Sequence, residues 1–336
     1  MPVLTVSHLQ KRFNLEAGFF ARYGRFVYAV NGVSFSIGKN EAYGLVGESG
    51  CGKTTTARLL VRMYEADAGE ILFHHGRHGD RPVTVGALRK EELRQYREKV
   101  RYVFQDPARS LNPRMSVYEV LVSGCRKPLR RQGIGEKQLR QKAAAILEEV
   151  GLQAADLEKR PSEFSGGQRQ RISIARGLLM EPDLLICDEV VSALDVSIQG
   201  QILNLLLDIR EKRGMSFLFI AHDLKVACYF CDRIGVMYNG ELMEEAPAGG
   251  LYREALHPYT RLLFSSAAGK TVTDTAEKTA SDTGEKTAPD TGRCAFAERC
   301  SHAVERCLRE HPELRETDPG HLIRCFNPCS PNPSTP

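Results

Sequence analysis

The stretch EAYGLVGESGCGKTTTARLL, residues 41–60, carries the strongest information about the fold. Residues 41–47 form an apolar run typical of a buried strand, and residues 53–66 read as a helix. Between the two, the segment Gly47–Thr54 fits the pattern Gly-x-x-x-x-Gly-Lys-Ser/Thr. The glycines of such a turn let backbone N–H groups point at phosphate oxygens, and the helix N-terminus adds the positive end of its dipole. The stretch predicts a phosphate-binding loop; a glycine-rich turn without a ligand is the alternative.

The residue types of this loop suit a nucleoside triphosphate bound together with Mg²⁺. The ammonium group of Lys53 is expected to reach the β- and γ-phosphates, and the hydroxyl of Thr54 is expected to bind Mg²⁺. The other residues expected to contact the nucleotide are Gly47, Glu48, Ser49, Gly50, Cys51, Gly52 and Thr55.

A second apolar run, DLLICDE (183–189), ends in two carboxylates. At the mouth of a buried strand, Asp188 is expected to hold the Mg²⁺ shell, and Glu189 is the candidate general base for an attacking water. Two acids at this position are also typical of a solvated strand end with no catalytic role. The phosphate loop earlier in the chain favours the nucleotide interpretation.

The stretch EFSGGQRQRISIARGLL (163–179) predicts a second anion site. An amphipathic helix is expected here, and hydroxyl and N–H groups gather at its N-terminus. The residues that supply them are Ser165, Gly166, Gly167 and Gln168.

A chain with these two phosphate sites resembles the ATP-binding cassette (ABC) ATPases. The signature of that family begins Leu-Ser-Gly-Gly-Gln, and Phe164 stands here in place of the leucine. In the family, two cassettes pair head to tail, and each ATP lies between the phosphate loop of one cassette and the signature of the other. The resemblance implies an α/β fold, namely a P-loop nucleotide-binding domain with a helical subdomain. It also implies ATP and Mg²⁺ as cofactors and a second cassette as partner, either another copy or a homologous chain.

Two further positions match the catalytic residues of the family. Gln105, in the sequence YVFQDP, matches the glutamine that contacts Mg²⁺ and water and relays the nucleotide state to a membrane partner. His222 ends the apolar run MSFLFIAHD (215–223) and matches the histidine that reads the γ-phosphate. The resemblance therefore implies that Glu189, His222 and Gln105 carry the catalytic work.

The loop that crosses to the other cassette is matched by Ser192–Asp195, with Asp195 as the expected nucleotide-side contact. Val190 and Val191 precede it, where the family usually has a small residue or proline and then threonine. This difference from the family pattern lies next to the residues that are expected to contact the second cassette of the dimer.

An aromatic side chain stacks on adenine in this family. Phe13, in LQKRF, matches that residue, and Tyr28 competes for the role because the segment NLEAGFFARYGRF lies between the two.

The composition divides the chain into three parts. Residues 1–265 alternate strand-like and helix-like segments and form the expected nucleotide-binding domain, with a helical subdomain at about 107–180. Residues 266–292 contain a near-repeat rich in Thr, Asp, Ala and Gly, which is typical of a flexible linker because it has no apolar stripe to bury. Residues 293–336 form a small extension that is rich in cysteine.

Within the family, the chain is most similar to the ATPase subunits of oligopeptide, dipeptide and nickel importers. The basis is the insert after Phe13, the segment LHPYTRLLFSSA (256–267) and the pattern of the cysteines near the C-terminus. The resemblance implies two transmembrane permease subunits as partners, an indirect link to a periplasmic or lipoprotein solute-binding protein, and a peripheral position on the cytoplasmic face of the inner membrane. The sequence itself has no signal peptide and no long apolar segment.

Five of the ten cysteines lie between Cys294 and Cys329. Among Cys294, Cys300, Cys307 and Cys325, with Cys329 as a spare, the spacing lacks the close pairs typical of structural zinc, whereas iron–sulfur clusters take four thiolates without such pairs. Some members of the similar group carry a [4Fe–4S] cluster in this region. The expected ligands are Cys294, Cys300, Cys307 and Cys325; zinc and free thiols remain as alternatives.

Two other functions stay open. A soluble ABC ATPase of DNA repair or translation usually has two cassettes in one chain or large inserts, and a phosphonate-processing assembly uses similar cassettes. The net charge of +4, with no Lys/Arg-rich block that stands out, argues against a nucleic-acid partner.

Overall fold

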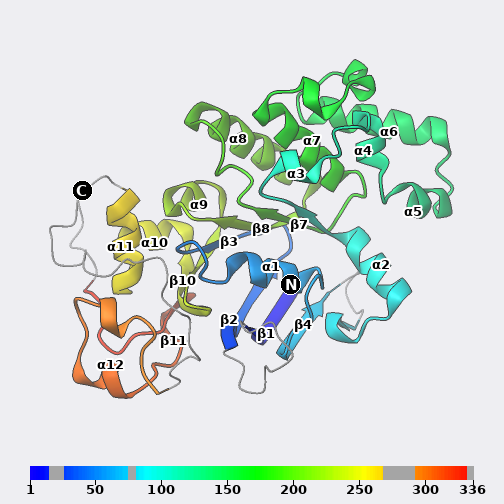
Figure 1. The fold of residues 1–336 in the computed structure, drawn as a ribbon. Coiled ribbons are helices and arrows are strands. Elements are labelled where there is room, and N and C mark those ends of the chain that lie inside the picture. The colour runs from blue at the N-terminus through cyan, green and yellow to red at the C-terminus, as the bar shows by residue number, and fades with distance from the viewer. Residues whose placement is uncertain (15–25, 75–80, 268–291, 331–336) are drawn as a thin grey trace. The chain divides into compact units, whose positions relative to one another are not determined.

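The computed structural model describes residues 1–14, 26–74, 81–267 and 292–330 (Figure 1). The chain forms two compact units. The helical unit comprises Met1 and Leu88–Leu218, and the sheet unit comprises Pro2–Ala87 and Phe219–Pro336. Most of the expected linker, residues 268–291, lies outside the described residues, as does most of the insert that follows Phe13.

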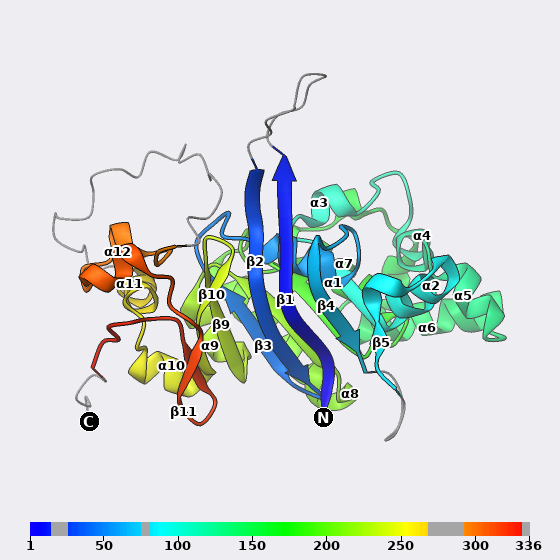
Figure 2. The same ribbon diagram turned by 90° about the horizontal axis from the view of Figure 1, so that it is seen from below.

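The first part of the sheet unit is a four-stranded antiparallel sheet in the order β2-β1-β4-β5. Its two long strands run side by side (Figure 2). Alternating apolar residues such as Val33, Phe35 and Ile37 are buried, which gives this sheet one core-facing side. The strands are β1 (Pro2–Asn14), β2 (Phe26–Gly38), β4 (Ala68–Phe73) and β5 (Val83–Thr84).

The second sheet of this unit has the strand order β11-β12-β10-β9-β3. β3 and β9 are parallel, and every residue of β3 is buried, as the apolar run at 41–47 predicts. A tight turn at Asn239 and Gly240 joins β9 to β10, and both residues have positive φ, at 45° and 85°. The strands are β3 (Ala42–Val46), β9 (Arg233–Tyr238), β10 (Glu241–Pro247), β11 (Arg315–Asp318) and β12 (His321–Ile323).

The helices of the sheet unit are short. They are α1 (Lys53–Leu60), η1 (Val85–Ala87), α9 (Leu224–Phe230), α10 (Ala248–Glu254), α11 (Pro258–Ala267), η4 (Ala297–Arg299) and α12 (Glu305–Arg309). β8 (Ser216–Ala221), which is entirely buried, carries the chain from the helical unit into the sheet unit.

The helical unit contains two parallel strands and a series of helices. The strands are β6 (Val100–Val103) and β7 (Leu184–Asp188), paired with Val100 opposite Leu184. The helices are α2 (Lys90–Lys99), α3 (Pro107–Ser110), α4 (Val117–Val122), α5 (Arg126–Arg131), α6 (Glu136–Glu149), η2 (Ala154–Glu158), η3 (Pro161–Glu163), α7 (Gly166–Leu178) and α8 (Val196–Arg213). Between residues 107 and 178 every regular element is helical.

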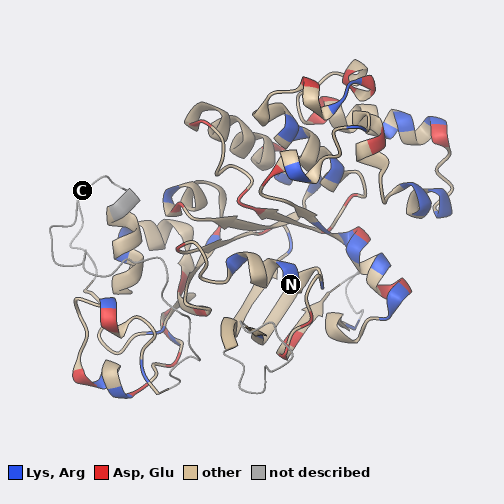
Figure 3. Cartoon of the chain, viewed as in Figure 1, with Lys and Arg blue, Asp and Glu red and all other residues tan. Residues whose placement is uncertain are grey.

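Basic side chains gather on α5, which Figure 3 shows in blue. The sequence analysis did not single out this block. Arg126 and Arg130 pair with Glu136, and Arg131 pairs with Glu91. Two carboxylates of the same unit, Glu136 and Glu91, therefore offset part of this local positive charge.

The helix expected at 53–66 is shorter than predicted, because α1 ends at Leu60. Arg62 has a positive φ of 53°, and the N–H of Met63 donates to the carbonyl of Arg58. This left-handed turn closes the helix, and neither a glycine nor a proline marks it in the sequence.

Three carboxylates are buried on β10, which the sequence analysis did not anticipate. Glu244 is fully buried and accepts hydrogen bonds from the N–H groups of Leu256 and His257 at 2.7 and 3.1 Å. Glu241 accepts from the side-chain amide of Asn31, and Glu245 accepts from the hydroxyl of Tyr43, both at 2.7 Å. Each buried acid therefore has a polar partner, as burial of a carboxylate requires. 

The cysteine-rich extension is an integral part of the sheet unit. β12 pairs with β10, and Ile323 packs into a small core with Leu256 and Cys325. His321 lies 2.7 Å from Glu244, and His311 lies 2.8 Å from Glu241. The extension thus supplies partners for two of the buried carboxylates.

Membrane spans were sought among the described helices. None of them is both long and apolar enough to cross a bilayer.

His257 makes the stability of the sheet unit sensitive to acid. It is buried, and its Nδ1 accepts a hydrogen bond from the N–H of Tyr259 at 3.0 Å. Burial lowers the pKa of His257 to about 4, and Glu244 offsets this only in part. Because the folded-state pKa lies below the unfolded value of about 6.5, this contribution to stability is complete above pH 6.5 and is lost as the pH falls toward about 4.

We expect His257→Asn, whose side-chain oxygen can replace the Nδ1 acceptor, to weaken the acid sensitivity. The measurement is the urea midpoint of unfolding at about pH 7 and about pH 5; the free-energy loss linked to His257 is at most about 3 kcal/mol. The exposed His302 provides the matched control through His302→Asn. An unchanged pH dependence in His257→Asn would contradict this assignment.

Candidate nucleotide-binding site

The phosphate loop lies between β3 and α1, as the sequence predicts. Gly52 is the N-cap of α1, with a left-handed φ of 112°. A Cβ atom at Gly52 would lie 2.0 Å from the carbonyl oxygen of Ala29, and one at Gly47 would lie 2.1 Å from that of Met237. Neighbouring backbone therefore encloses the loop so closely that glycine is required at both positions.

Lys53 is held within its own loop. Its ammonium group donates to the carbonyl oxygens of Gly47 and Glu48 at 2.7 and 2.9 Å, and the side chain is buried. Thr54 and Thr55 follow on the first turn of α1 and are half-buried. Ser49 and Gly50 form the exposed tip of the loop, whereas Cys51 is buried.

Glu48 connects the phosphate loop to other parts of the sheet unit. Its N–H donates to the hydroxyl of the buried Tyr259 at 2.9 Å. Its carboxylate accepts two hydrogen bonds from Arg299, each of 2.8 Å. Tyr259 belongs to the segment 256–267 and Arg299 to the extension, so both C-terminal segments reach the phosphate loop.

Of the expected Mg²⁺ and catalytic residues, Gln105, Asp188 and Glu189 belong to the helical unit, whereas Thr54 and His222 belong to the sheet unit. Asp188 is buried at the end of β7 and accepts a hydrogen bond of 2.5 Å from the hydroxyl of Tyr102. The amide of Gln105 donates to the carboxylate of Glu189 at 2.8 Å. Glu189 has a positive φ of 48°, which is rare outside glycine and common at functional sites. Tyr102 was not predicted, and only its place opposite the run 183–189 could have indicated it.

The expected signature forms the N-terminus of α7. The hydroxyl of Ser165 accepts from the N–H of Gln168 at 3.3 Å, and the Gln168 side chain accepts from the N–H of Ser165 at 3.0 Å. This reciprocal pair is a capping box. Phe164 is buried, which shows that the aromatic residue is accommodated where the family usually has leucine. Ser165, Gly166 and Gln168 are exposed, and Gly167 is half-buried.

The loop expected to reach the other cassette follows Glu189. Val190 and Val191 are buried, and Ser192 donates to the carbonyl of Glu189 at 2.9 Å. Asp195 is exposed and serves as the N-cap residue of α8. The two valines therefore act as core residues of the helical unit.

His222 and the two aromatic candidates lie in the sheet unit. His222 is exposed and directly follows β8, and Asp223 caps the N-terminus of α9. Phe13 is half-buried, and its ring meets that of Tyr64 edge-on at 5.3 Å. Tyr28 is also half-buried and lies opposite Arg12 in the strand register.

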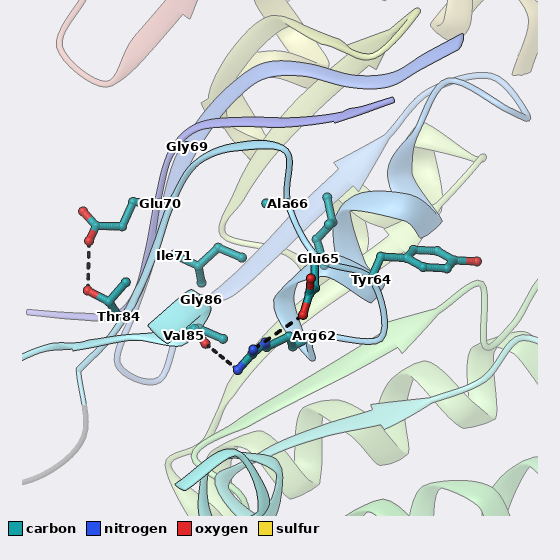
Figure 4. A pocket seen from close by; sticks show the side chains of 11 residues that line it. Arg62, Tyr64, Glu65, Ala66, Gly69, Glu70, Ile71, Thr84, Val85 and Gly86 are labelled. Carbon is teal, nitrogen blue, oxygen red and sulfur yellow. Dashed lines mark hydrogen bonds and ion pairs between the residues drawn. The ribbon is translucent and has the colours of Figure 1, made fainter. Parts of the chain in front are cut away.

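A cavity of about 230 Å³ in the sheet unit is lined by residues that include Tyr64, but by none of the expected ones. Figure 4 shows Arg62 pointing toward Glu65 and the carbonyl of Val85, and Thr84 bonded to Glu70. The cavity therefore stands apart from the predicted nucleotide contacts.

The cysteines expected as cluster ligands lie near one another in the extension. Burial raises the pKa of Cys294, and the neighbouring thiols of Cys307 and Cys300 raise it further. Burial also raises the pKa of Cys325 to about 12, with added contributions from the other three expected ligands. The N–H of Cys294 donates to the carbonyl of Cys307 at 2.9 Å.

The arrangement of these thiols is not that of a formed metal site. Within the described ranges, no group of three or more His, Cys, Asp or Glu residues could hold a metal ion as placed. The donor set suits a thiolate-bound metal in its chemistry, since the extension supplies four cysteines, but the thiols would have to lose protons and close together to bind one.

Two family models match the chain. The ABC transporter family matches residues 30–192, and the C-terminal region of oligopeptide/dipeptide transporters matches residues 243–307. The first match contains the phosphate loop and the two strand-end acids. The second contains the segment that reaches the loop through Tyr259, and also Arg299.

Relatives align over nearly the whole chain. A Brucella ovis protein provisionally named as a peptide import ATP-binding protein is 42% identical over 97% of this chain and 98% of its own. The oligopeptide transport ATP-binding protein OppF of Bacillus subtilis is 40% identical over 96% of both chains. A solved structure from Clostridium perfringens, described as part of the ABC transporter complex cbiONQ, superposes with a TM-score of 0.61 at 25% identity, covering 75% of this chain and 90% of that one.

A dimeric ATP-binding cassette bound to ADP and Pi gives the same TM-score of 0.61 at 25% identity, covering 73% of this chain and 98% of that one. The fold, the phosphate loop and the two matched family regions agree with these relatives. The chain therefore belongs to the family of ABC transporter ATP-binding proteins, in the group with the oligopeptide/dipeptide transporter C-terminal region.

Proposed function

We propose that this chain is the ATP-hydrolysing, energy-coupling subunit of a peptide-type ABC importer. The observation that carries the proposal is the 40–42% identity to peptide and oligopeptide transport proteins over at least 96% of the chain. That alignment includes the C-terminal region as well as the cassette. A soluble ABC ATPase of repair, translation or phosphonate processing is the alternative.

ATP hydrolysis in this proposal depends on positioning and charge neutralisation. Lys53 and the N–H groups at the start of α1 bind the phosphates. Thr54, Asp188 and Gln105 are the residues that would hold Mg²⁺, and the ion would neutralise phosphate charge. Glu189 takes the proton of the attacking water, with the hydrogen bond from Gln105 fixing its carboxylate. His222 contacts the γ-phosphate.

The second ATP-binding surface comes from a partner cassette. Ser165 and Gly166 are exposed at the start of α7, where N–H groups point outward. Asp195 is exposed, and the neighbouring Val196 is an apolar side chain that is 84% exposed. An exposed anion site beside an exposed apolar residue suits contact with another cassette, either a copy of this chain or a homologue.

The complete importer would add two transmembrane permease subunits and, indirectly, a solute-binding protein. In this assembly the chain is peripheral on the cytoplasmic face of the cell membrane. Gln105 at the end of β6, hydrogen-bonded to Glu189, is the residue through which the nucleotide state would reach the permease.

The extension is proposed to bind a [4Fe–4S] cluster, with zinc as the alternative. The support is the presence of Cys294, Cys300, Cys307 and Cys325 in one small segment, where neighbouring thiols raise the pKa of Cys294 and Cys325. A bound cluster would cross-link a segment whose described residues, 293–330, form two short strands and two short helical elements.

Replacing Glu189 tests the hydrolysis step. We expect Glu189→Gln to retain ATP binding, lower turnover by about 10²-fold or more, and increase the ATP-dependent dimer fraction, because glutamine cannot accept the proton. Phosphate release and size-exclusion chromatography with ATP measure these effects. The control is Glu163→Gln, an exposed acid whose substitution should leave turnover intact. Unchanged turnover in Glu189→Gln would remove this residue from the role of base.

Co-purification tests the importer assignment. The tagged chain, expressed in its own cell and solubilised with detergent from the membrane fraction, is expected to recover two multi-span permease subunits. The untagged chain is the control. Recovery of nucleic acid or of a soluble complex, with no permease, would support the alternative function instead.

Metal analysis of protein purified without oxygen tests the extension. We expect absorption near about 400 nm with about four irons and four sulfides per chain, both lost in Cys300→Ser. Cys228→Ser replaces a half-buried cysteine outside the extension and serves as the matched control. Stoichiometric zinc without colour would establish the alternative metal, and protein free of both metals would refute the site.

A further inference from the structure

Arg299 of the extension forms a two-point contact with the phosphate loop. Both terminal nitrogens of its guanidinium donate to Glu48, one to each carboxylate oxygen, at 2.8 Å. A third hydrogen bond, of 3.4 Å, runs to the hydroxyl of Tyr238. Paired, parallel hydrogen bonds of this kind fix geometry as well as charge.

The Arg299 side chain is held in place by aromatic rings. Its guanidinium carbon lies 5.6 Å from the ring centre of Tyr238 and 5.7 Å from that of Phe296. Phe296 is buried and meets Tyr238 edge-on, and Tyr259 packs against both rings. These ring contacts already restrict the conformations of the Arg299 side chain. Forming the hydrogen bonds to Glu48 therefore costs less side-chain entropy.

Glu48 connects this contact to the lysine of the loop. The carbonyl oxygen of Glu48 accepts a hydrogen bond from Lys53, and its N–H donates to Tyr259. The backbone of Glu48 is therefore held by Lys53 on one side and by the 256–267 segment on the other. The extension holds the side chain of the same residue.

We propose that Arg299 is a positioning residue through which the cysteine-rich extension sets the affinity of the phosphate loop for nucleotide. It acts through Glu48, by holding the peptide that contacts Lys53 and by neutralising a carboxylate beside a site for a polyphosphate. The inference rests on the proposed function in one respect, that the ligand of the loop is ATP.

The expected effect is on binding rather than on folding. The side chains of Arg299 and Glu48 are 47% and 39% exposed, and ion pairs with this exposure add little to stability. A carboxylate left unpaired beside bound phosphates, however, repels them at short range. Removing Arg299 should thus weaken nucleotide binding, and removing the charge of Glu48 as well should restore it.

The experiment measures the Kd of a fluorescent ATP analogue for the full-length chain. We expect Arg299→Ala to weaken binding by about three- to tenfold at low salt, with a smaller ratio at high salt because screening reduces the repulsion. The double variant Arg299→Ala/Glu48→Gln is expected to recover most of this loss and to bind within about twofold of Glu48→Gln alone. Arg309→Ala is the matched control, because Arg309 pairs with Glu305 on α12 and both are about three-quarters exposed.

The possible results distinguish a failure of this inference from a failure of the proposed function. Equal affinities of the wild type and Arg299→Ala would overturn the inference while leaving the ATPase assignment intact. Weakened binding that Glu48→Gln fails to restore, or that does not change with salt, would also overturn it and indicate a purely structural loss. Failure of the wild-type chain to bind the analogue would refute the proposed function itself.

Discussion

Three carboxylates on one seven-residue strand, β10, impose the strictest physical requirement on the sheet unit. A buried carboxylate must be paired, and each of the three is paired with a different part of the chain. Glu245 contacts Tyr43 and Arg233 of the central strands, Glu241 contacts Asn31 of β2 and His311, and Glu244 contacts the backbone of Leu256 and His257 as well as His321. The places of the 256–267 segment and of the extension follow from this requirement.

The same arrangement relates distant parts of the sequence to the nucleotide site. Residues 256–267 and 293–330 lie beyond the cassette motifs, yet Tyr259 and Arg299 contact Glu48 directly. These contacts give a physical reason why a C-terminal region would be retained with this type of cassette. Its residues complete the surroundings of the phosphate loop, in addition to any role in binding metal.

The sequence alone was sufficient to predict the features that depend on interactions between residues close together in the chain. The loop glycines and the helix N-terminus at Ser165 depend on neighbouring residues, and each lies where it was expected. The end of α1 at Leu60 was missed because a non-glycine residue adopts the left-handed turn there. The sequence did not indicate the buried glutamates, Tyr102 or Arg299, because their hydrogen-bond partners lie far away in the chain. Hydrophobic periodicity depends on residues that are close together in the sequence, so it does not reveal such pairs.

The pairing of β12 with β10 has a further consequence, for solubility. With β12 and β11 in place, the outermost strand of the sheet is β11, whose four residues are all exposed and of which Arg315, Glu316 and Asp318 carry charge. A short, charged outer strand is a poor template for a strand of another molecule. The extension thereby protects the cassette from edge-to-edge aggregation, whatever its sulfur atoms bind.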